Sequence, residues 1–471
     1  MVKNYPPFEF NKTYKKTLKI YFEIFLKKKN KKIYWFGIAS LPLVTLTTAF
    51  IFIKLNKKNK KLININDYTK RHLSINYFQR MINNIKVKNF VYKIISFLFF
   101  FKKKVTVIYS TNTYTNSYCK NQNLFKIKYN PLESLDANEI SKYYIDHTFD
   151  KFFRKYLIKI NEVFFPNSKK FYKFTELEQY FHKFYKIYLL YVNETKNLKK
   201  LFITSYSGIF FIRLFMGAIQ FNKKSKIINL THGDVEVLNQ EPDIVADGVT
   251  LCNLQISKTI KYNIKLKKFL LKKYHLDIPK FFSYRHKNNF NLKSLTNEYS
   301  KNFDKKARNK VLIVGYPISN KFDLTANHIY PSKMFIIENK LIKSLKKSSF
   351  QVFYKSHPDT NKEMKKKIIE KRNFLTERFE DICEEFDYLI FTYHRSTTLG
   401  YALSKKIPIS LLTYKTLDLE KKTYQLFKKR ISFINCEIYK NNLAFNEKLL
   451  KKKVIESKKL VNLEAVKKLI L

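Results

Sequence analysis

Short runs of β-branched and aromatic residues alternate along the chain with longer stretches of helical periodicity. Such runs, bounded by turn-forming residues, are typical of buried strands, and apolar residues spaced three and four apart are typical of helices. The predicted strands cover residues 105–110, 201–208, 225–234, 247–253, 310–317, 350–358, 387–398 and 407–412. The predicted helices cover 138–160, 175–192, 209–222, 331–347, 362–372 and 446–471. This alternation predicts an α/β protein in which helices cover both faces of parallel sheets.

A polar, weakly patterned stretch divides the strand–helix rhythm into two halves. The chain is therefore expected to form two doubly wound, Rossmann-like parallel-sheet domains that face a cleft. Ligands of such sheets bind beyond the carboxyl ends of the strands. The expected parts are a basic N-terminal extension (1–32), an N-terminal acceptor domain (33–283), a linker (284–309), a C-terminal nucleotide-donor domain (310–435) and a C-terminal helical segment (436–471).

The uncharged segment 34–53, "YWFGIASLPLVTLTTAFIFI", has two interpretations. It is long enough for a transmembrane helix. Alternatively, residues 34–40 form a buried first strand, and Ser40 caps a helix that has Pro42 in its first turn. Lysines flank the segment on both sides, so a crossing that left the rest of the chain in the cytoplasm would export a basic stretch, against the positive-inside rule. The strand and helix are therefore favoured.

The net charge of +55 over 471 residues first suggests nucleic acid or a membrane surface as the partner. However, the lysines are scattered, and arginine, the residue best suited to read bases and phosphates, is scarce. Nucleic acid is therefore not expected, and attraction to anionic lipid or phosphorylated substrates is favoured. The four cysteines form no CxxC pair and the nine histidines no HxxxH or HExxH pattern, so neither a disulfide framework nor a metal site is predicted.

Polar and turn-forming residues gather where the predicted strands end. Because carboxyl ends of parallel strands share one edge of a sheet, these residues are expected to lie close together. Hydroxyls and free backbone N–H groups at a strand–helix junction suit a phosphate, and the basic side chains add positive charge. The set comprises His232 and Asp234 in the first half, then Gly315, Tyr316, Pro317, Lys355, His357, Pro358, Arg395, Ser396, Thr397 and Thr398 in the second.

Each of these residues also has a purely structural interpretation. Ser396 can serve as a helix N-cap, and His357 can be a turn residue before proline. Asp234 can close an Asx turn after Gly233. Their shared position at one sheet edge favours a functional site.

The order "HGD … VGYP … YKSHPD … FDYLIFTYHRSTTLGYALSKKIP" resembles the GT-B glycosyltransferases of bacterial surface polysaccharides. It is similar to sialyl- and polysialyltransferases, capsule Kdo transferases and CDP-glycerol glycerophosphotransferases. Those families carry a His-Pro after a strand, which His357-Pro358 matches, and a Ser/Thr pair further on, which Ser396-Thr397 matches. The similarity covers about residues 201–412. The sequence departs from the sialyltransferase pattern at His232, which stands where those enzymes carry an acid.

The resemblance implies transfer of a sugar, with a CMP-linked acidic sugar favoured, from a nucleotide-activated donor to a surface glycan or lipid-linked acceptor. His357 would stabilise the leaving phosphate, and Asp234 would be the general base, with His232 and then Glu236 as rivals. The enzyme would need no cofactor or metal and would work in the cytoplasm, either free or attached peripherally to the inner membrane. The alternatives are a CDP-glycerol-type glycerophosphotransferase and a non-catalytic scaffold protein that keeps the fold.

Overall fold

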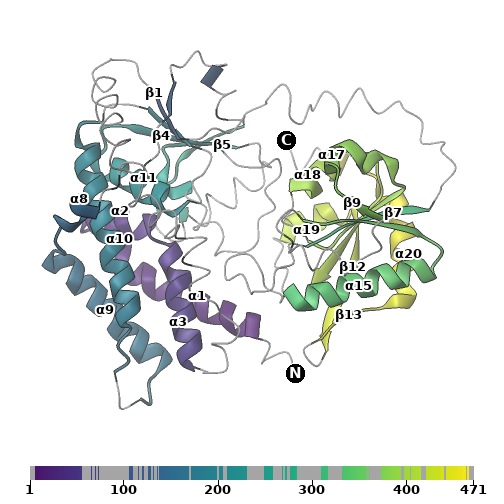
Figure 1. The fold of residues 1–471 in the computed structure, drawn as a ribbon, viewed down its shortest axis with the longest axis horizontal. Helices are drawn as coiled ribbons and strands as arrows, with labels where there is room; N and C mark the ends of the chain where they lie inside the picture. The colour runs from purple at the N-terminus through teal and green to yellow at the C-terminus, as the bar shows by residue number, and fades with distance from the viewer. Residues whose placement is uncertain are drawn as a thin grey trace.

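The computed structural model describes a large part of the chain. It covers residues 6–55, 106–109, 126–128, 137–168, 171–198, 201–204, 209–230, 249–257, 271–272, 276–283, 309–316, 331–357, 373–393, 397–403, 405–414, 421–439, 442–462 and 464–465, and the isolated positions 65, 69, 73, 115, 119, 120, 131, 135, 268 and 360. Within this part the protein is an α/β protein with two sheets, which lie in different halves of the molecule (Figure 1).

The first sheet is built entirely from parallel strands. Their order is β2-β1-β3-β4-β5-β6, so the direction in which strands are added reverses between β1 and β3. The strands are β1 (Thr106–Tyr109), β2 (Lys126–Lys128), β3 (Leu201–Thr204), β4 (Lys226–Leu230), β5 (Leu254–Ser257) and β6 (Lys280–Ser283). The apolar helix α11 (Phe210–Asn222) connects β3 to β4 and packs in one core with Phe202 and Ile227 of those strands.

A group of N-terminal helices shares this core. Helix α1 (Pro6–Phe25) buries Tyr21 and Phe25 against α9 (His147–Phe164) and α10 (Thr175–Glu194). Residues 6–25, expected within a basic extension, therefore belong to the first core.

The predicted strand at 34–40 is wrong, because residues 31–39 form helix α2 (Lys31–Ala39) and α3 (Pro42–Leu55) follows at once. Asn30 caps α2, since its side-chain oxygen accepts a hydrogen bond from the N–H of Ile33 at 3.1 Å. Every residue from Ile33 to Ala39 is buried, so the helix has no polar face that would reveal its period. The prediction that a helix has Pro42 in its first turn is confirmed.

The break between α2 and α3 is held by buried polar groups. The guanidinium of Arg213, on α11, donates to the carbonyl oxygens of Ala39 (3.2 Å) and Ile38 (3.1 Å), which the helix end leaves without helical partners. The Ser40 hydroxyl donates to the Phe36 carbonyl oxygen at 2.7 Å and lies 2.7 Å from the Tyr21 hydroxyl. Ser40 therefore closes α2 at its C-terminus, rather than capping the next helix with its side chain.

Among the described residues, none of the helices is by itself both long and apolar enough to cross a membrane. By length and composition alone, α2 and α3 together could do so, with a bend of 71° between them.

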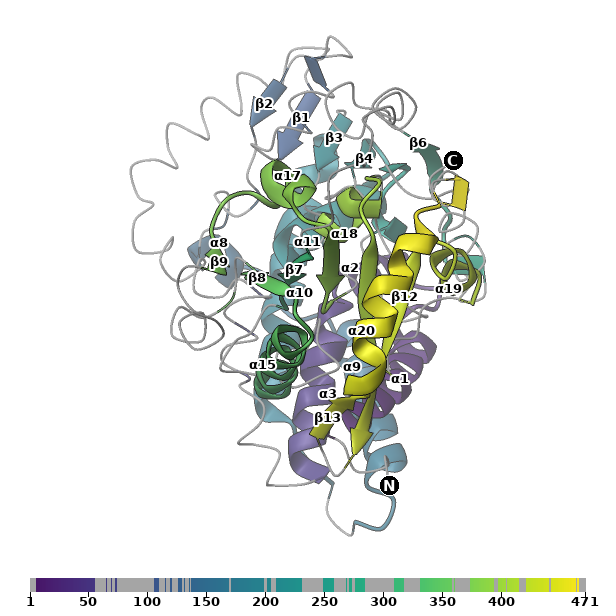
Figure 2. The ribbon, with the colours of Figure 1, turned by 90° about the vertical axis from the view of Figure 1, so that its right-hand side faces the viewer.

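The second sheet has the strand order β13-β12-β11-β10-β7-β8-β9. All neighbours are parallel except β12 and β13, the C-terminal hairpin drawn in yellow in Figure 2. The strands are β7 (Lys310–Val314), β8 (Gln351–Lys355), β9 (Phe374–Leu375), β10 (Tyr388–Phe391), β11 (Ile409–Tyr414), β12 (Ile431–Tyr439) and β13 (Asn442–Phe445). Residues 310–435 were predicted as the C-terminal domain, and β13 adds an antiparallel edge strand beyond them.

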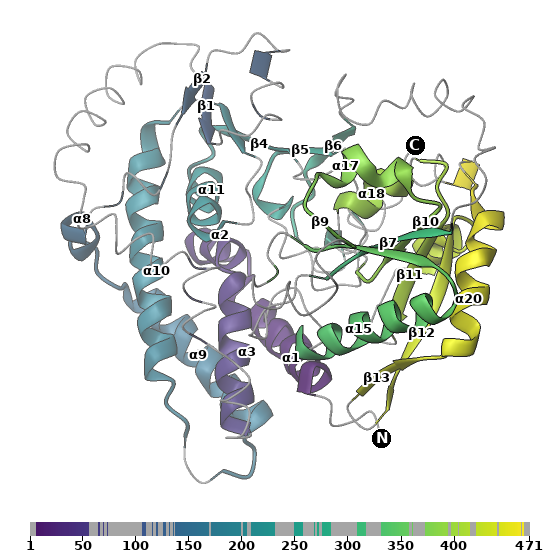
Figure 3. The same ribbon diagram turned by 45° about the vertical axis from the view of Figure 1, so that its right-hand side comes forward.

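Helices cover both faces of the second sheet, as the doubly wound prediction requires (Figure 3). Val311 and Ile313 of β7 face a core made with α15 (Pro331–Lys347) and α20 (Glu447–Glu456). Leu312 and Val314 point the other way, into a core made with α17 (Phe379–Ile382), α18 (Thr397–Leu403) and α19 (Lys421–Phe427).

Two predicted boundaries are wrong. The expected strand at 247–253 contains a 3-10 turn, Val249–Leu251, and β5 begins only at Leu254. The expected helical segment 436–471 begins as strand, because Cys436 pairs with Phe445 across the β12–β13 hairpin and both side chains enter the core. The predicted linker 284–309 lies outside the described residues apart from Asn309.

Candidate functional site

The second sheet has a topological switch point between β7 and β10. Counted from β7 as the first strand, its parallel strands follow the order 3-2-1-4-5-6 of dinucleotide-binding folds. Val314 of β7 pairs in register with Lys355 of β8 and Phe391 of β10, so these strands end at one level. In sheets of this order the ligand lies outside the carboxyl ends of the strands at the switch point. Several of the predicted site residues lie at or directly after the ends of β7 and β8.

A buried carboxylate ties the three strand ends together. Glu338 lies on α15 and is fully buried. Its Oε1 accepts hydrogen bonds from the backbone N–H of Tyr316, after β7, at 2.7 Å and from the hydroxyl of Thr392, after β10, at 2.6 Å. Its Oε2 accepts from the hydroxyl of Tyr354, on β8, at 2.6 Å. Glu338 thus fixes the spacing of β7, β8 and β10 at the switch point.

Gly315 is the first residue beyond β7, and its backbone N–H donates to the carbonyl oxygen of Lys355 at 2.9 Å. A Cβ at position 315 would lie 2.5 Å from the ring carbon Cζ of Tyr354 and closer still to its hydroxyl oxygen. Glycine is therefore required here by close approach, so that Tyr354 can reach Glu338.

The segment that carries His357 is attached to the end of β7. The hydroxyl of Thr360 donates to the carbonyl oxygen of Tyr316 at 3.1 Å, and its backbone N–H donates to the carbonyl oxygen of His357 at 3.0 Å. The ring of Tyr316 also packs edge-to-face on Tyr393, which follows β10, with centroids 5.2 Å apart. The backbone at His357 is thereby linked to the same switch point as Gly315 and Tyr316.

Five of the predicted site residues can be placed with their surroundings. Gly315, Tyr316, Lys355 and His357 follow or end β7 and β8, and both Lys355 and His357 are half-buried. Thr398 lies in the first turn of α18, which begins at Thr397. Their common pocket stays a prediction. Of the rest, Thr397 is described as the first residue of α18, and six lie outside the described residues: His232, Asp234, Pro317, Pro358, Arg395 and Ser396.

Burial raises the pKa of Glu338 to about 7, although the hydrogen bonds from Thr392, Tyr354 and the Tyr316 backbone lower it. Between pH 4.5 and about 7, the folded protein therefore holds a proton on Glu338 that the unfolded carboxyl, with a pKa of 4.5, has released. This group's contribution to stability is fully present below the unfolded pKa and is lost as the pH rises through the folded pKa.

Glu338→Gln should remove the fall in unfolding free energy between pH 4.5 and 7, because glutamine has the shape of the protonated acid and cannot ionise. Relative to the variant, the wild type should lose about 3 kcal/mol of unfolding free energy between pH 4.5 and 7, since one pKa unit is worth about 1.4 kcal/mol. Hydrogen exchange of peptides from β7 and β8, followed across this range, measures the difference. Glu385→Gln, an exposed exchange in the same half, should keep the wild-type profile. Parallel profiles for the wild type and Glu338→Gln would refute the assignment.

Glu338, Tyr354 and Thr392 were not among the site residues predicted from the sequence. A signal for Glu338 was present, because it stands between Met334 and Leu341, on the face of α15 that the apolar residues define. An acid on an apolar helix face requires partners, and those partners come from β8 and from the turn after β10.

Comparison with known proteins adds little to this picture. No family model matches the chain, and no curated protein matches it significantly. Among solved structures, the chain is similar to an alpha,alpha-trehalose 6-phosphate synthase from Burkholderia multivorans, with 8% sequence identity and a TM-score of 0.32. That alignment covers 64% of this chain and 70% of the synthase. The fold assignment rests on the strand order and the two-sided helical cover.

Proposed function

We propose that the chain is a glycosyltransferase of the GT-B type, which transfers a sugar from a nucleotide-activated donor to a surface glycan or a lipid-linked acceptor. The observation that carries the proposal is the meeting of Gly315, Tyr316 and the His357 segment at the switch point of the second sheet. Sheets of this order bind nucleotides at that position.

The second sheet would hold the nucleotide of the donor. Backbone and side-chain groups of Gly315–Pro317 would contact the base, ribose or phosphate. Lys355, Pro358 and Arg395 would line the phosphate side with the hydroxyls of Ser396, Thr397 and Thr398. Positive charge placed where a phosphate departs stabilises the transition state more than the ground state.

His357 would act on the leaving phosphate, either by its charge or by giving up a proton. A group in the first half would take the proton of the acceptor hydroxyl, with Asp234 first and His232 as its rival. Proton transfer by a positioned side chain contributes ~10²–10⁴-fold to the rate of such reactions.

We favour a CMP-linked acidic sugar as the donor, because the motif around His357-Pro358 and Ser396-Thr397 is similar to that of the sialyltransferases. The net charge of +55 would draw the protein to anionic lipid at the inner leaflet, where a lipid-linked acceptor resides. Donor binding by these residues requires no metal.

A donor panel tests the proposal. The full-length chain is incubated with CMP-linked acidic sugars, nucleoside-diphosphate sugars or CDP-glycerol, with and without a chelator, and the released nucleotide is measured. Release from one activated sugar, unchanged by the chelator, is the expected result. Release from CDP-glycerol alone would replace the proposal with glycerophosphate transfer. Binding of a sugar nucleotide without any release would replace it with a non-catalytic scaffold.

A further inference from the structure

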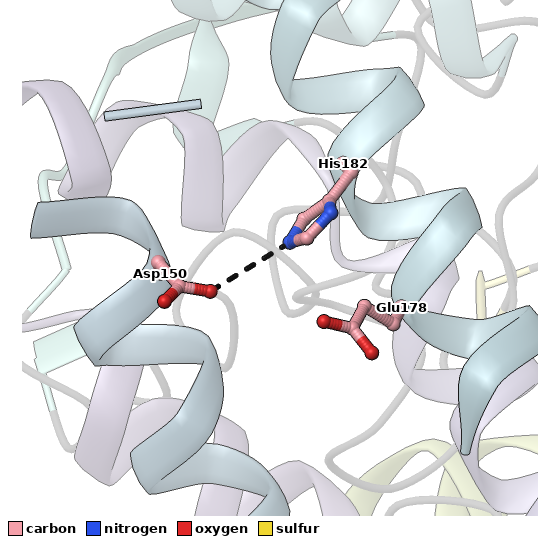
Figure 4. A group of neighbouring side chains, drawn as sticks. All are labelled: Asp150, Glu178 and His182. Atoms are coloured by element: carbon pink, nitrogen blue, oxygen red, sulfur yellow. Dashed lines mark ion pairs between the residues drawn. The ribbon is translucent and has the colours of Figure 1, made fainter. Parts of the chain in front are cut away.

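A cluster of two carboxylates and one imidazole lies on the outer helices of the first half. Its residues are distant in sequence from the switch-point residues. Asp150 of α9 faces Glu178 and His182 of α10, as Figure 4 shows. The potential ligand atoms of the three residues all lie within 4.8 Å of one another, and all three side chains are half-buried. Because Glu178 and His182 are four residues apart, they project from the same face of α10.

The imidazole of His182 carries an unexplained polar atom. Its Nε2 is shielded from solvent and has no hydrogen-bond partner among the described residues. The nearest acidic oxygen, Oδ1 of Asp150, is 4.0 Å away, beyond hydrogen-bond range. Buried polar atoms rarely lack a hydrogen-bond partner, so a bound ligand is expected next to this nitrogen.

The surroundings hold the imidazole and the carboxylate in place. The rings of Phe149 and Phe153 pack against His182 with centroids 6.0 and 5.7 Å away. Arg154 holds Oδ2 of Asp150 through its Nε at 2.7 Å and leaves Oδ1 directed at His182. Such outer contacts are typical of ligand side chains, which need a fixed orientation.

The local charges suit a cation. Two carboxylates face one imidazole, while the charge of Arg154 is bound to the outer oxygen of Asp150. Burial lowers the pKa of His182 and Lys186 contributes to the lowering, whereas Glu178 and Asp150 oppose it. The negative charge that faces the imidazole therefore favours a cation in the space between the three side chains.

We propose that Asp150, Glu178 and His182 bind a divalent transition-metal ion that links α9 to α10. One imidazole nitrogen and two carboxylate oxygens suit Zn²⁺ or a neighbouring first-row ion, and the nitrogen donor disfavours Mg²⁺ and Ca²⁺. Bonds of about 2.0–2.2 Å place ligand atoms roughly 3–4 Å apart, so small side-chain rotations from the observed positions close the site. Water completes the coordination.

Zn²⁺ titration of the metal-free, full-length chain by calorimetry tests the site, with Co²⁺ absorption as a second probe that reports nitrogen ligation. The wild type should bind one Zn²⁺ per chain. His182→Gln should weaken binding at least ~100-fold, because loss of an outer-shell partner alone costs about 10- to 100-fold. His147→Gln is the matched control on α9, where an exposed histidine outside the cluster is changed.

A second pair of variants guards against misfolding. Glu178→Gln should weaken Zn²⁺ binding, whereas Glu176→Gln, an exposed exchange two residues earlier, should not. Emission from Trp35, the only tryptophan, reports whether the first core is intact, since Trp35 is buried in that core. The proposal is overturned if the wild type binds no Zn²⁺, or if His182→Gln and Glu178→Gln bind as tightly as their controls.

Discussion

His357→Ala should lower the rate of nucleotide release from the preferred donor by ~10²–10⁴-fold, the usual contribution of a positioned acid–base group. The side chain is half-buried, and its backbone carbonyl is bound to Thr360, which is bound in turn to Tyr316. Truncation should therefore leave the strand ends in place and remove the imidazole that we propose acts on the leaving phosphate. The measurement is the initial rate at saturating donor, compared with the donor dissociation constant. A large fall in rate with little change in binding is expected.

His147→Ala is the control for this experiment, because His147 is an exposed histidine of the first half that lies outside the switch-point site. Hydrogen exchange of β7 and β8 peptides should be the same in His357→Ala and the wild type. Turnover at the wild-type rate in a correctly folded His357→Ala protein would remove His357 from the reaction. A donor that no longer binds would instead make His357 a binding residue.

The regular part of the fold was predictable from sequence because buried parallel strands appear as continuous apolar runs. The predicted runs at 105–110, 310–317 and 407–412 overlap β1, β7 and β11. The same rule failed at 34–40, where a short helix buried on all sides also produces a continuous apolar run. The capping residue Asn30 was the local signal that distinguishes the two, since an Asn before an apolar run marks a helix start.

The candidate site was predictable only in its outline. Strand ends and turn residues identify Gly315 and His357, since the topology of parallel sheets brings such ends together. The buried position of Glu338 was indicated by the apolar face of α15, but its partners were not predictable, because Glu338 contacts Tyr316, Tyr354 and Thr392 across separations of 16 to 54 residues. Helical periodicity identifies the face of a helix that is buried, whereas the donors to Glu338 come from three other segments.

Gly315→Ala should have the largest effect on stability of any single methyl addition at the described strand ends of the second sheet. The new Cβ would lie 2.5 Å from Cζ of Tyr354, whose ring is fully buried against Phe374 and cannot move freely. Overpacking of this kind costs about 1–3 kcal/mol, and above pH 7, where Glu338 is ionised, loss of its hydrogen bond from Tyr354 costs about 1.5–3 kcal/mol more. We therefore expect a loss of roughly 3–5 kcal/mol in the stability of the second half. Hydrogen exchange of β7 and β8 peptides measures it, and Trp35 emission should stay unchanged because that residue reports on the first core.

A double-mutant cycle separates the steric cost from the lost hydrogen bond. Tyr354→Phe removes the hydroxyl that the new Cβ would strike first, together with its bond to Glu338. Since Gly315→Ala already displaces that hydroxyl, the double variant should be less destabilised than the two single changes added together. Strict additivity would show that the two residues do not compete for the same space. In that case the close approach of β7 to Tyr354 would not be the reason that glycine occupies position 315.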